Sequence, residues 1–474
     1  MTRMGHTQSR RVVGDGRPRG PALKHVIRRA AAVLVLTLAT GLARAEEATP
    51  TWPPALPGAK NGTVTLKTDL YLQVPQAVEE QRKKDEAAPF VVSKTPPTID
   101  LAYHGSLPNE ARNGTGWSAW GDIAVASDGK VYSGIGDHGD DAGGNSYCFI
   151  YQWDPATKTL KQVVDMNLVV PRKPGQPTWS KVHARIDEGL DGKIYFCCTL
   201  NDGNAAKDPR YKWTKDLPGG QLYQFDPKTG KTIAFANLPP ARCTATSLLD
   251  RKRNIWWCNL EAGPNALFAL DLKTKEVLYQ APAGSMVSNR NFALAKDGTV
   301  YFNGKGGTWR CDAQAKRITP VGVAIGMRSS TRESTDGHIY GVAGGKLFRF
   351  TPATRELRQL GSEFLTGNYT TVCVLSPDER FLYYMPGAHG GAKDIGTPAV
   401  QYEIKTGQRK VIAFVREPFE KRCAYVPAGS YGVKMSADGS TLYVNFNGSQ
   451  APPRQQPGFG LTSFAAIHIP KSER

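Results

Sequence analysis

The side chains best suited to chemistry lie in one glycine-rich stretch, Gly134–Asn145, which reads GIGDHGDDAGGN. It places His138 among three aspartates, directly after the strand-like run DGKVYS. The carboxylates could bind Ca²⁺, although the D-x-D-x-D-G spacing and distal Glu of an EF-hand are absent. Alternatively, Asp137 or Asp140 could orient an imidazole for proton transfer, or the aspartates could simply cap turns.

Two further histidines extend the possible chemistry. His183 and His389 stand in other parts of the chain, each beside polar or glycine-rich sequence. Neutral imidazoles from separate segments suit Zn, Mn or Fe, so His138, His183 and His389 together predict a divalent metal site. The competing interpretation is that each histidine is a hydrogen-bonded loop residue.

The elements that must position these residues are given by a repeat. Seven turns precede a run of β-branched and aromatic residues: SDGKVYSG, LDGKIYFC, DRKRNIWWC, KDGTVYFN, TDGHIYGV, PDERFLYY and ADGSTLYV. Asp-Gly before such a run indicates a hairpin, because glycine accepts the positive φ that the turn needs. A second strand pair follows most turns, as in FIYQWDPATKTL and KLFRFTPATREL. Four-stranded units repeated in this way predict an all-β fold, a seven-bladed β-propeller.

The predicted domain organisation has three parts. Residues 1–45 have the basic, apolar and Ala43-Arg44-Ala45 order of a secretory signal peptide. Residues 46–89 are rich in Pro, Lys and Glu and are interpreted as a leader or linker with a short helix around 76–87. Residues 90–474 form the propeller. Its last unit lacks a fourth strand, so we expect TIDLAYHGSL (99–107) to complete that blade and close the ring.

At these turns and strands the sequence resembles the seven-bladed propellers of the streptogramin-lyase, gluconolactonase and YVTN kind. The resemblance covers about residues 99–470 and is architectural. It implies a fold that hosts lyases, lactonases, dehydrogenases and binding scaffolds. The metal-binding Glu, Asn and Asp of gluconolactonase-type enzymes have no assignable counterparts in this sequence. Some exported propeller lyases that cleave uronic-acid oligosaccharides bind a metal through histidines from several blades.

Propeller topology brings one set of polar residues to the mouth of the central channel. Counting back eight residues from the Asp of each Asp-Gly or Asp-Glu turn places Trp120, His183, Asn289, Arg328, Thr370 and Ser430 on the innermost strands, and the third unit, which lacks such a turn, is assigned Thr244. None is aliphatic, whereas a buried core strand would favour Val, Ile or Ala. The loops between second and third strands are long in units one, two, six and seven, and they lie on the same side.

These residues are assigned expected roles. We predict His138, His183 and Tyr211 as catalytic residues. The predicted substrate-binding residues are Arg185, Arg242, Arg290, Arg328, Tyr369 and Trp120. Arginine is suited to this because its planar guanidinium binds a carboxylate through two hydrogen bonds.

Charge and cysteine content limit the class of partner. The formal net charge of +18 falls to about +10 without residues 1–45, which still favours anionic ligands. No cluster of basic and aromatic residues indicates nucleic-acid binding, and no apolar segment after the signal could span a membrane. The eight cysteines follow the signal and show no CxxC spacing, so zinc ribbons and c-type haem have no support. We expect a periplasmic or secreted monomer in which one or two disulfides can form.

Two functions therefore stay open. The first is a lyase or lactonase-type hydrolase that acts on an anionic carbohydrate or related small substrate, with a base, a cation for the developing enolate and an acid. The second is a non-catalytic periplasmic propeller that binds a glycan, peptide or protein.

Overall fold

The structure is a computed structural model, and the part of the chain that it describes begins at residue 53. It describes residues 53–84, 87–105, 117–137, 146–171, 179–200, 220–236, 238–239, 241, 243–261, 266–286, 291–312, 314–365, 369–451 and 460–474. The predicted signal peptide lies outside this part.

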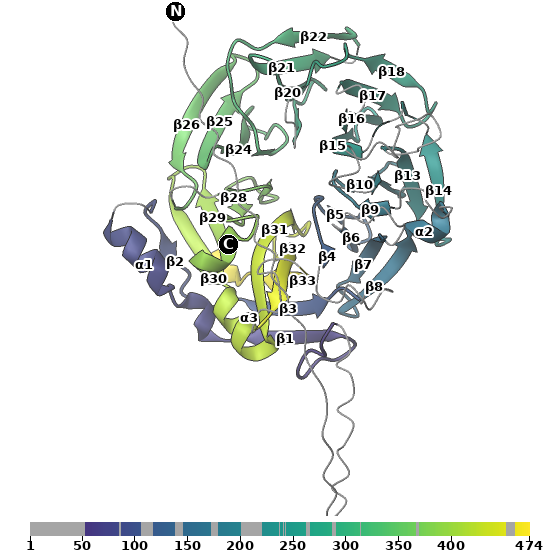
Figure 1. Ribbon diagram of the computed structural model, residues 1–474. Helices are drawn as coiled ribbons and strands as arrows, with labels where there is room; N and C mark the ends of the chain where they lie inside the picture. The colour runs from purple at the N-terminus through teal and green to yellow at the C-terminus, as the bar shows by residue number, and fades with distance from the viewer. Residues whose placement is uncertain are drawn as a thin grey trace, which may run out of the picture. The chain divides into compact units, whose positions relative to one another are not determined.

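Seven antiparallel sheets are arranged around a central channel as the blades of a β-propeller, which confirms the predicted fold class (Figure 1). In each blade the chain runs from the innermost strand outward. The first blade contains β4 (Trp117–Ser118), β5 (Ala124–Val125), β6 (Val131–Asp137), β7 (Cys148–Asp154) and β8 (Thr159–Asp165). The second blade contains β9 (Trp179–Lys181), β10 (Asp187–Glu188), β11 (Ile194–Cys197), β12 (Thr199–Leu200), β13 (Leu222–Asp226) and β14 (Lys231–Ala236). The third blade contains β15 (Cys243–Asp250), β16 (Ile255–Glu261), β17 (Leu267–Asp271) and β18 (Val277–Gln280), and the fourth contains β19 (Ala293–Leu294), β20 (Val300–Gly304), β21 (Gly307–Asp312) and β22 (Arg317–Pro320).

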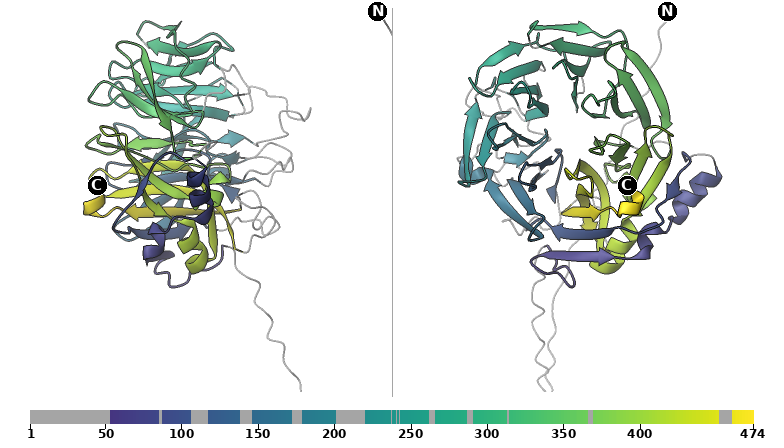
Figure 2. Two further views of the ribbon diagram at one scale, coloured as in Figure 1. Left: turned by 90° about the vertical axis from the view of Figure 1, so that its left-hand side faces the viewer. Right: turned by 180° about the vertical axis from the view of Figure 1, so that it is seen from behind.

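The remaining three blades complete the ring. The fifth blade contains β23 (Ser329–Ser330), β24 (Ile339–Ala343), β25 (Lys346–Thr351) and β26 (Glu356–Ser362). The sixth contains β27 (Cys373–Leu375), β28 (Phe381–Tyr384), β29 (Pro398–Glu403) and β30 (Arg409–Phe414). The seventh contains β31 (Tyr425–Met435), β32 (Thr441–Gln450) and β33 (Leu461–His468). Figure 2 shows the same ring edge-on and from behind.

The ring is closed by an N-terminal strand, as the sequence predicted. β3 (Thr98–Tyr103) pairs antiparallel with β33 and supplies the fourth strand of the last blade. A fifth strand, β1 (Thr63–Lys67), pairs with β3, and β2 (Val91–Val92) pairs parallel with β30 on the sixth blade. The stretch 46–89, expected as a leader or linker, thus contains residues that extend the outer edge of the ring.

The described helical segments are short. They are η1 (Asp69–Leu72), α1 (Gln76–Lys83), α2 (Met166–Val169), η4 (Gly391–Ile395), α3 (Arg416–Cys423) and η5 (Lys471–Glu473). α1 confirms the helix expected around 76–87. Within the described ranges, none of the helices has the length and apolar character needed to cross a membrane.

All seven predicted turns share one backbone feature, a residue with positive φ after the first turn position. Five of these residues are glycines, such as Gly129 at φ 83° and Gly298 at φ 95°. The other two are Asn254 at φ 57° and Glu379 at φ 56°, in the turns that lack Asp-Gly. The preceding aspartate commonly accepts a backbone N–H two residues on, as Asp128 does from Lys130 at 3.0 Å. The repeat in the sequence is therefore a repeat of turn geometry.

Carboxylates on the inner strands hold neighbouring blades together. Asp187 Oδ2 accepts the backbone N–H of Leu249 at 3.1 Å, and Glu188 Oε1 accepts that of Ser127 at 3.0 Å. Such hydrogen bonds satisfy buried backbone groups where strand pairing stops at a blade boundary.

Candidate functional site

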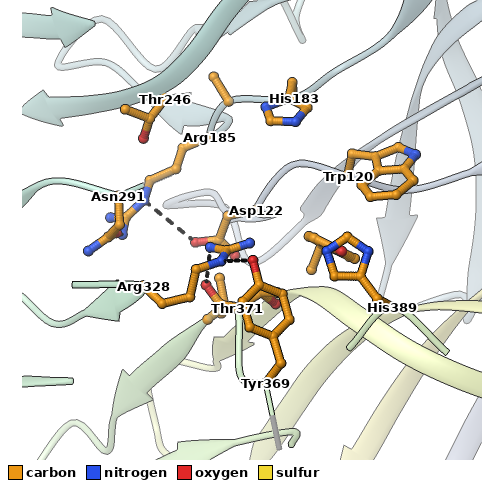
Figure 3. A pocket seen from close by; sticks show the side chains of 13 residues that line it. Trp120, Asp122, His183, Arg185, Thr246, Asn291, Arg328, Tyr369, Thr371 and His389 are labelled. Atoms are coloured by element: carbon orange, nitrogen blue, oxygen red, sulfur yellow. Dashed lines mark hydrogen bonds and ion pairs between the residues drawn. The ribbon is translucent and has the colours of Figure 1, made fainter. Parts of the chain in front are cut away.

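A pocket lies at the centre of the ring, where the inner strands of all seven blades begin. We call it the front pocket; its empty volume is about 540 Å³ (Figure 3). The chain enters each inner strand on the same side of the ring as the loops between second and third strands, so these starts converge there. The pocket is lined by Trp120, Asp122, His183, Ala184, Arg185, Thr246, Asn291, Arg328, Tyr369, Thr371, Val372, His389 and Tyr431.

One wall of the front pocket is a cluster of aromatic rings. The ring of His389 stacks on Tyr369 with centroids 5.1 Å apart and 26° between the planes. His389 also contacts Trp120 at 5.6 Å and Tyr431 at 5.4 Å, and Trp120 lies 4.9 Å from Tyr431. The ammonium of Lys181 sits 4.6 Å above the Trp120 ring. The wall therefore combines flat apolar faces with positive charge.

The backbone around His389 is shaped to present its ring to this wall. His389 itself has φ 59°, and its neighbours Gly387 and Gly390 have φ 88° and 93°. A Cβ on Gly387 would lie 2.6 Å from the backbone of Ala392, so only glycine fits. The N–H of Ala388 donates to the carbonyl of Tyr369 at 2.9 Å, which fixes the segment against the chain that enters the inner strand of the same blade. A positive φ is uncommon for a residue other than glycine, so the neighbouring glycines and this hydrogen bond hold His389 in its conformation.

Arg328 provides a cation in the front pocket. Its Nε donates to the phenol of Tyr369, and its Nη1 donates to the Thr371 carbonyl at 3.2 Å. The guanidinium lies 4.9 Å from the centroid of the Tyr369 ring and 6.0 Å from that of Tyr431. Among the described residues no carboxylate lies within ion-pair distance of Arg328. Its charge is thus held in place by neutral partners.

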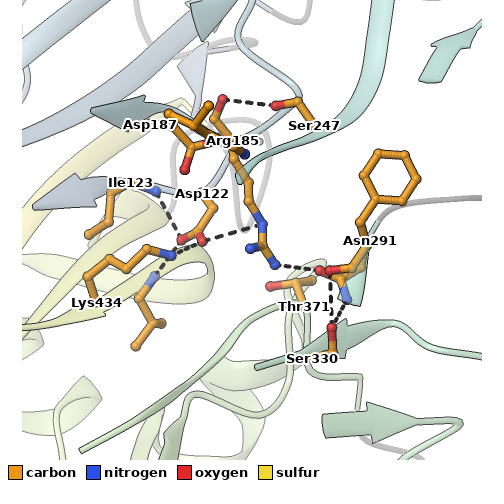
Figure 4. Close-up of polar contacts among 12 residues, drawn as sticks. Asp122, Ile123, Arg185, Asp187, Ser247, Asn291, Ser330, Thr371 and Lys434 are labelled. Atoms are coloured by element: carbon orange, nitrogen blue, oxygen red, sulfur yellow. Dashed lines mark hydrogen bonds and ion pairs between the residues drawn. The ribbon is translucent and has the colours of Figure 1, made fainter. Parts of the chain in front are cut away.

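An ionic network forms the floor of the front pocket (Figure 4). The Lys434 ammonium contacts Asp122 Oδ2, and Arg185 Nε lies 4.0 Å from the same oxygen. Arg185 Nη2 donates to Asn291 Oδ1 at 2.5 Å. Burial lowers the pKa of Lys434, and the Asp122 carboxylate opposes that effect. The side chain of Asp122 is 4 % exposed, so it is neutralised within the protein and is not available to a ligand as a free anion.

A second pocket lies on the other side of this network. This rear pocket has an empty volume of about 900 Å³ and shares Arg185 with the front pocket. Asp187, Arg332 and Lys434 also line it, and its rim is formed by turn residues such as Pro377. Burial raises the pKa of Asp187, while Arg332 and Arg185 act to lower it. Charged side chains therefore lie between the front pocket and the rear pocket.

The structure brings together six of the residues predicted for the site. Trp120, His183, Arg185, Arg328, Tyr369 and His389 all line the front pocket. His138, Tyr211, Arg242 and Arg290 lie outside the described residues. The roles assigned to these residues stay predictions.

The described residues do not supply the predicted metal site. Only His183 and His389 of the three proposed ligands are described. No group of three or more His, Cys, Asp or Glu side chains in the described ranges is placed to hold a metal ion. In the front pocket His389 is instead stacked among aromatic rings.

The positions assigned from the turns were wrong in detail for three inner strands. The pocket contains Thr246, Thr371 and Tyr431 where the assignment gave Thr244, Thr370 and Ser430. The hydroxyl of Thr244 instead donates to Gly220 at 2.9 Å. In two of these blades the strands are irregular: β15 has a register shift between Thr244 and Thr246, and β31 has one between Ser430 and Gly432. A bulge inserts a residue and changes which side chain faces the channel.

Sequence reasoning also missed Asn291, Thr371 and Lys434. A usable signal existed only for Lys434, which interrupts the otherwise apolar and small run YGVKM. Its partner Asp122 is 312 residues away, so nothing local indicates the pair.

Comparison with known proteins adds little beyond this geometry. No family model matches the chain, and no curated protein matches it. Among solved structures, it is similar to the extracellular domains of a putative one-component system and a putative hybrid two-component system from B. thetaiotaomicron. Sequence identity is 10 % in both cases, TM-scores are 0.47 and 0.45, and coverage is 74 % and 76 % of this chain.

The chain matches only 39 % of the length of each of those two structures. A chain of a mitotic checkpoint complex is similar at 8 % identity and a TM-score of 0.46, over 77 % of this chain and 95 % of that one. At these values the likenesses carry no argument about function. The site itself must indicate what the protein does.

Proposed function

We propose that the protein is an exported propeller that binds an acidic sugar in the front pocket and acts on it as a lyase or hydrolase. The observation that carries this proposal is Arg328, a guanidinium held in an aromatic-walled pocket without a described carboxylate partner. Export to the periplasm or the medium is part of the proposal and rests on the signal-like sequence of residues 1–45.

The charge of the pocket favours a carboxylate ligand. Arg185 and Arg328 both line it, and its one described carboxylate, Asp122, is neutralised by Lys434. An incoming carboxylate would accept hydrogen bonds from a guanidinium whose position is already fixed by Tyr369 and Thr371. Preorganisation of this kind raises affinity because fewer rotamers are lost on binding.

The aromatic wall favours a ring-shaped ligand. Trp120 and the stacked pair Tyr369 and His389 offer flat faces that the C–H groups of a pyranose can cover. A uronic acid combines such a ring with a carboxylate, so one ligand could use both the wall and Arg328. A neutral sugar would lack the charged interaction.

The same groups could catalyse β-elimination beside the carboxylate. A guanidinium on the carboxylate stabilises the developing enolate. His183 lines the pocket and could accept the proton at the α-carbon as general base. The Tyr369 phenol, which accepts a hydrogen bond from Arg328, could exchange a proton with the leaving oxygen.

Titration calorimetry with galacturonate oligomers, and with neutral galactose oligomers as the matched ligand control, tests the binding step. Arg328→Gln should weaken uronate binding by about 10- to 100-fold, since a hydrogen bond to a charged group contributes about 1.5–3 kcal/mol. Arg317→Gln, on an exposed position of β22, is the control variant and should change nothing. Equal affinity of Arg328→Gln and the native chain would overturn the proposal.

The catalytic step has a separate readout. Elimination creates a carbon–carbon double bond conjugated to the carboxylate, which absorbs in the ultraviolet. His183→Ala should abolish the increase in absorbance while leaving uronate affinity within about threefold. Growth of the signal at the native rate in His183→Ala would remove His183 from the mechanism.

The second candidate is a non-catalytic binding propeller, and one observation favours it. The rings of the front pocket already contact one another, as Trp120 and Tyr431 do at 4.9 Å. Uronate binding without any new ultraviolet absorbance or reducing ends would select this candidate.

A further inference from the structure

Two buried thiols from neighbouring blades touch each other. Cys148 begins β7 in the first blade, and Cys198 lies between β11 and β12 in the second. Their Sγ atoms are 3.4 Å apart, and the residues are 0 % and 1 % exposed. In the sequence they are 50 residues apart, and the intervening chain includes the outer strand of the first blade.

The close approach follows from how the first two blades pack. Cys148 pairs with Gly136 in the β6–β7 register. A Cβ on Gly136 would lie 1.8 Å from the carbonyl oxygen of Ser180, and one on Gly134 would lie 2.4 Å from Val182. Glycine at both positions lets the strands of adjacent blades come into contact, which brings Cys148 against Cys198.

We propose that Cys148 and Cys198 form a disulfide that links the first and second blades in the exported protein. A sulfur–sulfur bond is about 2.0 Å long, so the thiols need to approach by little more than an ångström, mainly by side-chain rotation. Free cysteines so placed are expected to be oxidised in a compartment that permits disulfides. The proposal depends on export but not on the ligand of the front pocket.

The reaction is a thiol–disulfide exchange with an external disulfide donor, either a small disulfide or a protein oxidase. One cysteine thiolate attacks the donor, releases one donor thiolate and forms a mixed disulfide. The other cysteine thiolate then displaces the second donor thiolate. Two thiols are oxidised, one donor disulfide is reduced, and the two protons end on the donor thiols.

Burial determines when this bond forms. Burial raises the pKa of Cys198 far above its ordinary value, and the contact with Cys148 raises it further. In the folded reduced protein the thiolate is therefore scarce, and both sulfur atoms are out of reach of a donor. Oxidation must occur during folding, before these blades close. The bond would join the start of β7 to the end of β11. In the sequence, the first long loop precedes β7 and the second long loop follows β11.

Differential alkylation of the full chain tests the inference. Secreted protein is treated with iodoacetamide in denaturant, reduced, treated with N-ethylmaleimide and digested. Of the eight cysteines, Cys148 and Cys198 should carry the second label. Iodoacetamide on Cys148 in secreted protein would overturn the proposal. Refolding of the purified chain in a glutathione redox buffer gives the same readout where secretion fails.

Adjacent cysteines supply a matched pair of variants. Cys197→Ser leaves both proposed partners in place and should keep the second label on Cys148. Cys198→Ser should transfer Cys148 to the first label. The reverse pattern, or a bond between Cys197 and Cys198 themselves, would show that the proposed pairing is wrong.

Discussion

Glu363 gives a test of the structure that is independent of any ligand. Its side chain follows β26 at the boundary of the fifth and sixth blades and is 0 % exposed. Neither carboxyl oxygen has a hydrogen-bond partner among the described residues. Its backbone carbonyl, in contrast, accepts the hydroxyl of Tyr384 at 2.6 Å. Burial raises the pKa of Glu363 to about 7, and the nearby Thr370 hydroxyl offsets this only in part.

The magnitude follows from linkage between ionisation and folding. The pKa of Glu363 rises from its ordinary 4.5 to about 7 in the folded state. The folded chain therefore binds more protons than the unfolded chain between these values, and stability falls as pH rises through this window. Below pH 4.5 the Glu363 carboxyl does not lower the free energy of unfolding through ionisation. Above pH 7 the full penalty is about 3 kcal/mol, at 1.36 kcal/mol for each pKa unit.

The assay is urea unfolding of the native chain and of Glu363→Gln between pH 4 and pH 8, followed by tryptophan fluorescence. A buried glutamine amide has its own desolvation cost, so the informative quantity is the change with pH of the stability difference between the two proteins. Between pH 4 and pH 8 the free energy of unfolding of Glu363→Gln should rise by about 3 kcal/mol relative to that of the native chain. A difference constant within about 0.5 kcal/mol would refute the buried carboxyl.

Glu473 provides a control of opposite sign. Burial acts to raise its pKa, but the Lys410 ammonium and the N–H groups of Thr95 and Lys94 hold that pKa below its ordinary value. Its stabilising effect is present at neutral pH and is lost as pH falls through the lowered pKa. Glu473→Gln should thus destabilise the protein at pH 7 and approach the native stability in acid.

Three further predictions concern the channel and the blade contact. Asp122→Asn leaves the Lys434 ammonium in the channel without its carboxylate and should cost about 3 kcal/mol in urea unfolding, whereas the double variant with Lys434→Met should recover part of that loss. A double-mutant cycle with no coupling would contradict the ion pair. His389→Gly relieves a positive φ but removes the stacked ring. The melting temperature should therefore change little, while uronate affinity should fall about tenfold. Unchanged affinity would show that the ring does not contact the ligand. Cys148→Ser should lose about 4 kcal/mol in oxidised protein, the loop-closure value for a 50-residue span, and most of this difference should vanish in reductant.

Much of the site was predictable because the repeat fixes where each inner strand begins. Trp120, His183 and Arg328 were placed at the channel by counting from the turns, and all three line the front pocket. The assignment failed for Thr244 and Ser430, where bulges in β15 and β31 change the side that each residue faces, and for Thr370, whose neighbours Tyr369 and Thr371 line the pocket instead. Bulges have no clear signature in the sequence, since they depend on the fit of neighbouring blades.

The sequence by itself determined the architecture of this protein. Asp-Gly turns before alternating strands specify local geometry, seven such units imply a ring, and an incomplete last unit requires a closing strand, which β3 provides. These features follow from backbone conformation over a few residues, and their repetition makes them recognisable in the sequence.

Only the tertiary structure decided which side chains meet. Asp122 and Lys434 contact each other because closure of the ring places the first and last blades side by side. Cys148 reaches Cys198 because two glycines let adjacent blades approach closely. His389 stacks on Tyr369 because a glycine-rich segment turns it inward. Such contacts join residues far apart in the chain, and local sequence cannot encode a partner that only packing brings near.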